Sequence, residues 1–314
     1  MISRDGFVTV RRTGLRVCIA GAGTIGSLFA AHLARVADVS VLTRREEHAR
    51  ALNERGLRVS GRADFTARVT AATDPAELPD QDLLIVACKG GDLEPLAARL
   101  AGHFPHAVVT TVQNGLGAEE IVAAHGDWPL LSAVTFMSGT RHDDTHVEYV
   151  LDTATWVGPY RGTTPADAER TAELIRSSGL KAKSFDDLRP AQWSKLIFNA
   201  TVNAVAALTG LPHDHHFAED ALGGLVHGLV DEGKAVAAAA GVALREDPWE
   251  MNVLATQRGH AHYPSMLEDV SARRPTEIEL ITGSLVREAK RRDVPVPLHA
   301  ALYALVKGKE ASYS

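Results

Sequence analysis

The segment Leu15-Arg-Val-Cys-Ile-Ala-Gly-Ala-Gly-Thr-Ile-Gly26 decides the fold of the amino-terminal part of this chain. Its first six residues form a short run rich in apolar side chains, which predicts a buried strand. Three glycines follow at GxGxxG spacing. Residues 27–36 then have the apolar rhythm of a helix, and residues 39–42 form a second apolar run. Strand, glycine turn, helix and strand in this order predict a Rossmann-type fold.

The glycine turn is the place where such a fold binds a dinucleotide. In this motif the first glycine makes the tight turn, the second lets the backbone approach the pyrophosphate, and the third lets the helix pack closely on the sheet. The start of the helix offers N–H groups and the positive end of its dipole to the phosphates. We therefore expect a dinucleotide to be bound by Gly21, Gly23, Thr24, Ile25 and Gly26.

The end of the second strand indicates which dinucleotide is bound. An NAD site usually places Asp or Glu there to hold the ribose 2′-hydroxyl, whereas this chain has Thr43-Arg-Arg45. An arginine suits the 2′-phosphate of NADP. The alternative is two solvated arginines ahead of a helix over residues 46–55. Arginines gain nothing from the dipole at a helix start, so the pattern favours NADP (NADPH), held by Arg44.

Two further polar residues directly follow predicted strands. Lys89 follows the apolar run 82–88, and Asn114 follows the run 107–112. Because ligands in parallel sheets bind beyond the carboxyl ends of the strands, we expect both side chains to contact a cofactor or substrate. The alternatives are a solvated lysine and an Asn-Gly turn.

The remaining pattern completes the predicted fold class. Further strands are expected as a hairpin at 56–61 and 65–69, as antiparallel additions at 132–136, 146–150 and 153–157, and at 180–184 after a helix over 164–178. Helices are expected at 191–208, 218–240, 248–256, 276–291 and 299–307. The sequence thus predicts an α/β Rossmann-type domain (a parallel sheet with antiparallel additions) over residues 15–187. An all-α carboxyl-terminal domain over 188–314 follows, and residues 1–14 form a short frayed leader.

Composition indicates which kinds of partner and which cellular compartment to expect. The net charge of -6 argues against nucleic acid, and no apolar run reaches the roughly 18 residues that span a membrane. Cys18 and Cys88 lie inside apolar runs, which favours buried thiols in a reducing cytoplasm over a disulfide. The segment His213-Asp-His-His216 lacks a ligand spacing, so we expect a polar loop and no metal site.

Polar residues also interrupt the apolar stretch Trp193–Leu208. Lys195, Asn199 and Asn203 are spaced at i, i+4 and i+8, so they share one face of the expected helix. Burying a lysine is costly unless a partner is present, and a polar stripe lining a cleft would explain the pattern. The alternative is a lysine that reaches the surface and asparagines that bond to neighbouring backbone.

A second polar group lies further along the chain. Pro264-Ser-Met-Leu-Glu-Asp269 precedes Thr276, which we expect to cap a helix whose first turn holds Glu277 and Glu279. The alternative is that these acids only stabilise the helix dipole, and that Ser265 is only a cap.

Taken together, these motifs make the chain similar to the ketopantoate reductases (2-dehydropantoate 2-reductases). The resemblance runs from residue 15 almost to the end. It rests on Gly21–Gly26, Gln113-Asn-Gly-Leu-Gly117, Trp193-Ser-Lys195 with its two asparagines, and the Pro264–Asp269 and Thr276–Glu279 segments. It implies a Rossmann domain followed by a helical domain similar to that of 6-phosphogluconate dehydrogenases. It also implies reduction of ketopantoate, a small 2-oxo acid, to pantoate with NADPH, on the route to pantothenate and coenzyme A.

The resemblance also implies a role for each matching residue. It makes Lys195 the catalytic lysine and Glu277 its carboxylate partner. Asn199 and Asn203 would hold the substrate hydroxyl, and Ser265 would bind the substrate carboxylate. Asn114 and Lys89 would lie near the cofactor.

The chain departs from some relatives at His262, where they carry Asn, which bears on how the substrate is held. Reduction of another small branched 2-oxo acid or a lactone, and a non-catalytic NADP-binding sensor, stay open as alternatives. The sequence also leaves open whether the chain is a monomer or a homodimer.

Overall fold

The chain forms two compact units in a computed structural model that describes residues 13–213, 221–257 and 264–313. The first unit comprises Met1–Gln113 and Glu119–Leu188, and the second comprises Asn114–Ala118 and Arg189–Ser314. The short segment 114–118 therefore belongs to the second unit, although it lies within the first unit's part of the sequence. Most of the expected leader, residues 1–12, lies outside the described residues.

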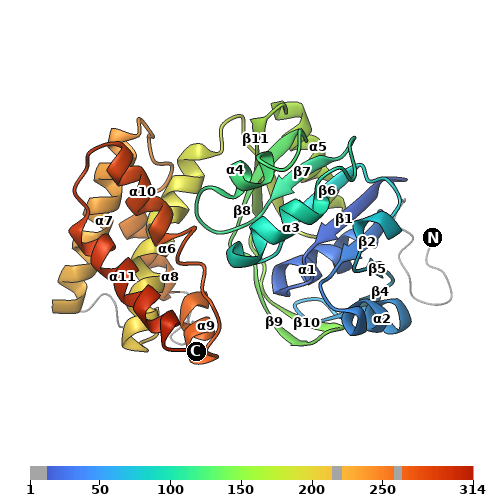
Figure 1. Ribbon diagram of the computed structural model, residues 1–314, viewed down its shortest axis with the longest axis horizontal. Coiled ribbons are helices and arrows are strands. Elements are labelled where there is room, and N and C mark those ends of the chain that lie inside the picture. The colour runs from blue at the N-terminus through green and yellow to red at the C-terminus, as the bar shows by residue number, and fades with distance from the viewer. Residues whose placement is uncertain (1–12, 214–220, 258–263, 314) are drawn as a thin grey trace. The chain divides into compact units, whose positions relative to one another are not determined.

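The first unit contains an eight-stranded sheet with the order β12-β11-β8-β7-β6-β1-β2-β5 (Figure 1). Its strands are β1 (Arg16–Ala20), β2 (Asp38–Leu42), β5 (Thr70–Ala72), β6 (Leu83–Val86), β7 (Val108–Thr111), β8 (Leu130–Thr135), β11 (Thr155–Arg161) and β12 (Ala182–Ser184). All pairs from β5 through β8 are parallel, and their order is that of the Rossmann fold. The order reverses between β1 and β6, which is where such sheets bind ligands. The predicted fold class is confirmed.

Helices connect these strands. They are α1 (Thr24–Leu33), α2 (Glu46–Arg55), α3 (Leu93–Leu100), α4 (Ala118–Ala123) and α5 (Pro165–Ser177), with the short 3-10 helices η1 (Pro75–Glu77) and η2 (Gly90–Asp92). Helix α1 begins earlier than expected because Gly23 is its N-cap, so the glycine turn leads straight into the helix. Helix α5 begins as expected, with Thr164 and Asp167 in a capping box.

One predicted strand has an unexpected parallel neighbour, and another lies in a different sheet. β8 pairs antiparallel with β11, as expected, but it pairs parallel with β7, because α4 intervenes and returns the chain to the same end of the sheet. The expected strand 146–150 corresponds to β10 (His146–Leu151), which joins a separate sheet of order β4-β3-β10-β9. Its other strands are β3 (Leu57–Gly61), β4 (Phe65–Ala67) and β9 (Ser138–Asp143). The β3–β4 hairpin and the antiparallel β11 are confirmed.

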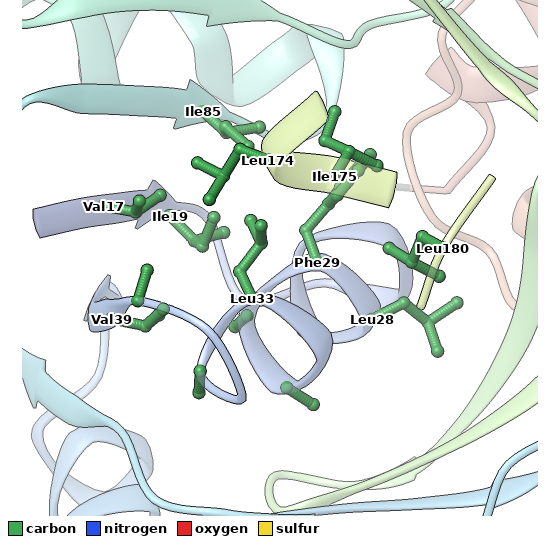
Figure 2. Close-up of a cluster of buried hydrophobic side chains, with 14 of the residues drawn as sticks. Val17, Ile19, Leu28, Phe29, Leu33, Val39, Ile85, Leu174, Ile175 and Leu180 are labelled. Carbon is green, nitrogen blue, oxygen red and sulfur yellow. The ribbon is translucent and has the colours of Figure 1, made fainter. Parts of the chain in front are cut away.

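A buried apolar cluster fixes α1 and α5 to the sheet (Figure 2). Alternate residues of β1 point into it. Helix α1 is buried on all sides from Gly26 to Leu33, whereas α5 contributes side chains from one face. The labelled members with no more than a few per cent exposure include Val17, Ile19, Leu28, Phe29, Leu33, Leu174 and Ile175. This packing anchors the glycine turn between β1 and α1.

The second unit is built around α6 (Arg189–Thr209), which is buried over most of its length. The other helices are α7 (Ala221–Ala239), α8 (Pro248–Gln257), α9 (Ser265–Ser271), α10 (Thr282–Arg291) and α11 (Pro297–Ala311). Side chains of α6, α7, α9 and α11 share one apolar cluster. Within residues 189–213, 221–257 and 264–313 the regular elements are all helices, as expected for this part of the chain.

The helix expected over 276–291 begins six residues late, at Thr282. Thr276 does not cap it. The Leu280 carbonyl accepts a hydrogen bond from the Leu116 N–H at 2.9 Å, and the Ile278 carbonyl accepts from the Gly283 N–H at 2.8 Å. These bonds hold residues 277–281 in turns outside the regular helix. The prediction that Glu277 and Glu279 lie in the first helical turn is therefore wrong.

Candidate active site

Lys195 lies in the buried middle of α6 with only 8% of its surface exposed. The alternative of a lysine that reaches the surface is therefore wrong. Burial lowers the pKa of Lys195 to about 8, and the charge of Glu277 acts in the opposite direction by favouring the ammonium form. The structure thus holds an amine that changes charge near neutral pH on a helix that is otherwise apolar.

Asn114 bridges Lys195 and Glu277. The Lys195 Nζ donates to Asn114 Oδ1 at 2.7 Å, and Asn114 Nδ2 donates to Glu277 Oε2 at 2.9 Å. An ammonium is only a donor and a carboxylate only an acceptor, so the amide satisfies both in this one orientation. The three side chains form a polarised chain of hydrogen bonds that aims the amine.

Gly115 and Leu116 fix the position of Asn114. Gly115 has φ +96°, and a Cβ built there would lie 1.7 Å from the Leu280 carbonyl oxygen. Only glycine allows this approach, and the Leu116 N–H then donates to the same oxygen at 2.9 Å. The segment 114–118 is therefore tied to the turn that carries Glu277, within the second unit.

Thr276 and Glu310 hold the Glu277 turn from its other side. The backbone N–H and the hydroxyl of Thr276 both donate to Glu310 Oε1, each at 2.7 Å. The Thr276 hydroxyl also accepts from the Ile278 N–H at 3.1 Å. Because α10 begins only at Thr282, the alternative in which Glu277 serves the helix dipole is wrong. Its carboxylate is directed to Asn114 instead.

The other two polar residues of α6 have different partners. Asn199 Nδ2 lies 3.4 Å from Asn114 Oδ1, whereas Asn203 Oδ1 accepts from the Met266 N–H at 3.3 Å. Helix α9 has Pro264 at its N-cap and no side-chain cap of its own, so Asn203 supplies one from α6. Ser265, the first residue of α9, is exposed. His262 lies outside the described residues.

The glycine turn of the first unit fits the backbone of a dinucleotide site. Gly21 has φ +109°, and a Cβ there would lie 2.6 Å from the Cys88 backbone N. A Cβ on Gly26 would lie 1.9 Å from the Gly21 carbonyl oxygen, whereas one on Gly23 would meet nothing within 4 Å. The first and third glycines thus permit close packing, and the second leaves open space at the start of α1, where Thr24 and Ile25 form the first turn.

The cationic residues expected at this site lie at the carboxyl ends of β2 and β6. The Arg44 side chain is exposed, and its Nη1 donates to Asp92 Oδ1 at 2.6 Å. Arg45 Nη2 donates to Asp144 Oδ1 at 2.5 Å. Lys89 is exposed and is the N-cap of η2, just beyond β6. Asp92 was not singled out in the sequence, although it comes only three residues after Lys89.

Gln113 belongs to a motif quoted above, but the sequence assigns it no role of its own. Its Nε2 donates to the carbonyls of Val86 and Cys88, each at 3.0 Å, and so ties the end of β7 to the end of β6. Its place at a strand end, just before Asn114, is the signal that would have identified it.

Other expectations from the sequence concern thiols, metals and membranes. Cys18 and Cys88 are free, and burial raises the pKa of the Cys18 thiol to about 12. No group of three or more histidine, cysteine or carboxylate side chains suited to a metal is found in the part of the chain that the structure describes. His213 Nε2 lies 3.2 Å from the Asn252 carbonyl oxygen, whereas residues 214–216 lie outside the described part. None of the described helices is long and apolar enough to cross a membrane.

Comparison with known proteins identifies the family. The model of the family "Ketopantoate reductase PanE/ApbA" matches residues 17–162, and that of "Ketopantoate reductase PanE/ApbA C terminal" matches residues 187–310. The 2-dehydropantoate 2-reductase of Archaeoglobus fulgidus is 30% identical over 296 residues, which cover 94% of this chain and 98% of that protein. The enzyme of the same name from Halobacterium salinarum is 31% identical over 299 residues (93% and 98%).

A solved structure agrees with these matches. The crystal structure of 2-dehydropantoate 2-reductase from Methylococcus capsulatus superimposes with a TM-score of 0.85 at 29% identity, covering 96% of this chain and 98% of that one. The chain therefore belongs to the ketopantoate reductase family of oxidoreductases.

Proposed function

We propose that this chain reduces ketopantoate to pantoate with NADPH, in the cytoplasm, on the route to pantothenate and coenzyme A. The observation that carries the proposal is the hydrogen-bonded series Lys195, Asn114 and Glu277, in which a buried amine is aimed by an amide and kept charged by a carboxylate. The names of the relatives support this substrate. The two free cysteines are compatible with a reducing compartment.

The chemistry requires a proton for the ketone oxygen. When bound, the dinucleotide supplies the hydride to the ketone carbon. Lys195 holds the proton at Nζ, stabilises the negative charge that develops on the oxygen, and donates the proton to it. Asn114 Oδ1 fixes the direction of Nζ, and Glu277 favours the ammonium form that this role needs. The apolar surroundings of α6 exclude water from the amine.

The remaining residues bind and orient the substrate in this proposal. Asn203 has its Oδ1 engaged by Met266, so its Nδ2 is the donor offered to a substrate oxygen. Asn199 contributes a second amide beside Asn114. Ser265 binds the substrate carboxylate through its exposed hydroxyl.

The dinucleotide is held in the first unit. The backbone at Gly21, Gly23, Thr24, Ile25 and Gly26 receives the pyrophosphate, and the open space at Gly23 supports this role. Arg44 and Lys89 provide cationic groups at neighbouring strand ends. Asn114, whose amide lies against Lys195, borders the cofactor in this proposal. We keep residues 15–187 and 188–314 as the proposed boundaries of the cofactor domain and the catalytic domain.

A panel of 2-oxo acids assayed with NADPH and with NADH tests the proposal. Ketopantoate should be among the best substrates by kcat/KM. Faster reduction of another branched 2-oxo acid, or of a lactone, would assign the chain to that substrate. Tight NADPH binding without oxidation by any substrate would point to a sensor. Light scattering of the same preparation distinguishes a monomer from a homodimer.

A further inference from the structure

Both arginines at the carboxyl end of β2 are paired with acids from other segments. Arg44 Nη1 contacts Asp92 Oδ1 at 2.6 Å, and Arg45 Nη2 contacts Asp144 Oδ1 at 2.5 Å. A guanidinium whose charge is balanced by a carboxylate attracts a second anion less than a solitary one does. Asp144 Oδ1 also lies 3.2 Å from Arg141 Nη1, so two arginines share its charge, whereas Asp92 pairs with Arg44. Asp92 is therefore the carboxylate that weakens the attraction of Arg44 for a 2′-phosphate.

Asp92 is directed to Arg44 instead of to the helix that it precedes. It occupies the N-cap position of α3, where aspartate commonly accepts a hydrogen bond from a backbone N–H in the first turn. The structure shows no such side-chain cap at Asp92. Its Oδ1 accepts from Arg44 instead. Capping α3 does not account for this carboxylate, whereas a role beside Arg44 does.

Arg44 and Asp92 together supply both kinds of side chain by which proteins distinguish NADP from NAD. NAD sites hold the ribose 2′-hydroxyl with an Asp or Glu, and NADP sites accommodate the 2′-phosphate with an arginine. Here Arg44 follows β2, and the carboxylate is supplied by η2, beyond β6. Asp92 can accept a hydrogen bond from a hydroxyl, but it repels a phosphate that carries about two negative charges.

We infer that Asp92 relaxes the cofactor preference of this chain, so that it uses NADH alongside NADPH. The inference rests on the proposed function only in requiring that a nicotinamide dinucleotide binds at Arg44. Removing the charge of Asp92 makes the site more selective for NADPH. Because the Arg44 and Asp92 side chains are 74% and 40% exposed, solvent weakens their interaction, and the expected change in preference is about three- to tenfold.

Binding measurements without any 2-oxo acid test this inference directly. The dissociation constants of NADPH and NADH are measured by the fluorescence of the reduced nicotinamide, for the wild-type chain and for Asp92→Asn and Asp92→Ala. Asp64→Asn is the matched control, because Asp64 pairs with Arg58 at 3.2 Å in the same unit and is also exposed. The control removes the same charge from the turn between β3 and β4, which belong to the other sheet.

We expect the wild-type chain to bind both dinucleotides within about tenfold of each other. Both Asp92 variants should raise the ratio of the NADH constant to the NADPH constant by about three- to tenfold, an effect that shrinks at high salt, while Asp64→Asn leaves it unchanged. A ratio that moves equally in the control, or by less than about twofold in both Asp92 variants, would overturn the inference. If the wild-type chain bound neither dinucleotide, the proposed function would fail as well.

Discussion

Replacing Glu277 by Gln removes one charge from the Lys195 site and preserves its shape. The new amide oxygen can still accept a hydrogen bond from Asn114 Nδ2, which lies 2.9 Å from Glu277 Oε2 in the wild-type chain. The proton on Lys195 then loses the carboxylate that favours it. Because Lys195 must be protonated to donate, wild-type activity should hold below the Lys195 pKa of about 8 and fall as the pH rises through it. In Glu277→Gln the fall should begin at lower pH.

The expected shift of the pH profile follows from the distance between Lys195 and Glu277. Two hydrogen bonds of 2.7 and 2.9 Å and one amide group separate the ammonium from the carboxylate. Opposite charges roughly 6 Å apart attract by about 3 kcal/mol at an effective dielectric constant of about 20, which corresponds to about two pH units. Glu277 is only partly buried, so solvent reduces this effect. The pH at which activity has fallen to half should therefore be lower in Glu277→Gln by roughly one to two units. Activity at pH 7.5 should fall about three- to thirtyfold.

The assay is kcat/KM for ketopantoate with saturating NADPH, measured from about pH 6 to about pH 10. Glu279→Gln is the matched control, because Glu279 lies two residues away, has the same charge, and is half exposed beside Arg287 and Lys307. Its profile should coincide with that of the wild type. If Glu277→Gln keeps the wild-type midpoint, or if the wild-type rate stays constant to about pH 10, Lys195 is not the acid described above.

Three further substitutions test other parts of the site. Lys195→Ala should lower kcat by at least about a hundredfold with NADPH affinity nearly unchanged, and near-normal turnover would remove its catalytic role. Arg44→Ala should weaken NADPH far more than NADH in the same fluorescence titration, and equal losses would reduce Arg44 to a surface charge. Gly115→Ala should lower the free energy of unfolding in urea by at least about 2 kcal/mol and also reduce kcat, because its Cβ meets the Leu280 carbonyl. Gly102→Ala is its control, with φ +79° but nothing within 4 Å of the added Cβ, so its smaller cost should leave kcat unchanged.

The Rossmann core was predictable because its determinants are local. Its motif is contiguous, with the apolar run of β1, the three glycines and the apolar rhythm of α1 following one another. The spacing of the glycines by itself indicates the turn between strand and helix. Likewise Lys195, Asn199 and Asn203 were recognisable as one helical face because the helical period places them there. The same pattern favours burial as strongly as a lysine that reaches the surface, and the structure shows that Lys195 is buried.

The errors concern features that depend on distant residues. Thr276, Glu277 and Glu279 have the local pattern of a capped helix, but a bond from Leu116 to Leu280 delays the helix to Thr282. The alternation of apolar and polar residues identified β8 as a strand. It carried no information on how β8 pairs with β7, since the direction of β8 depends on the helix before it. The pairing of Asp92 with Arg44 links segments separated by 48 positions, and no period relates them.

The strap of five residues at 114–118 has a consequence for anyone who recombines this protein with its relatives. A chimera joined at residue 188 would combine a helical half from one parent with a strap from the other, although the strap carries the amide that orients the lysine of the helical half. Each half of such a hybrid should fold, but its turnover should be slow unless residues 114–118 and the helical half come from the same parent. The residues around Lys195 are thus encoded in two separate parts of the gene, and both must come from the same parent.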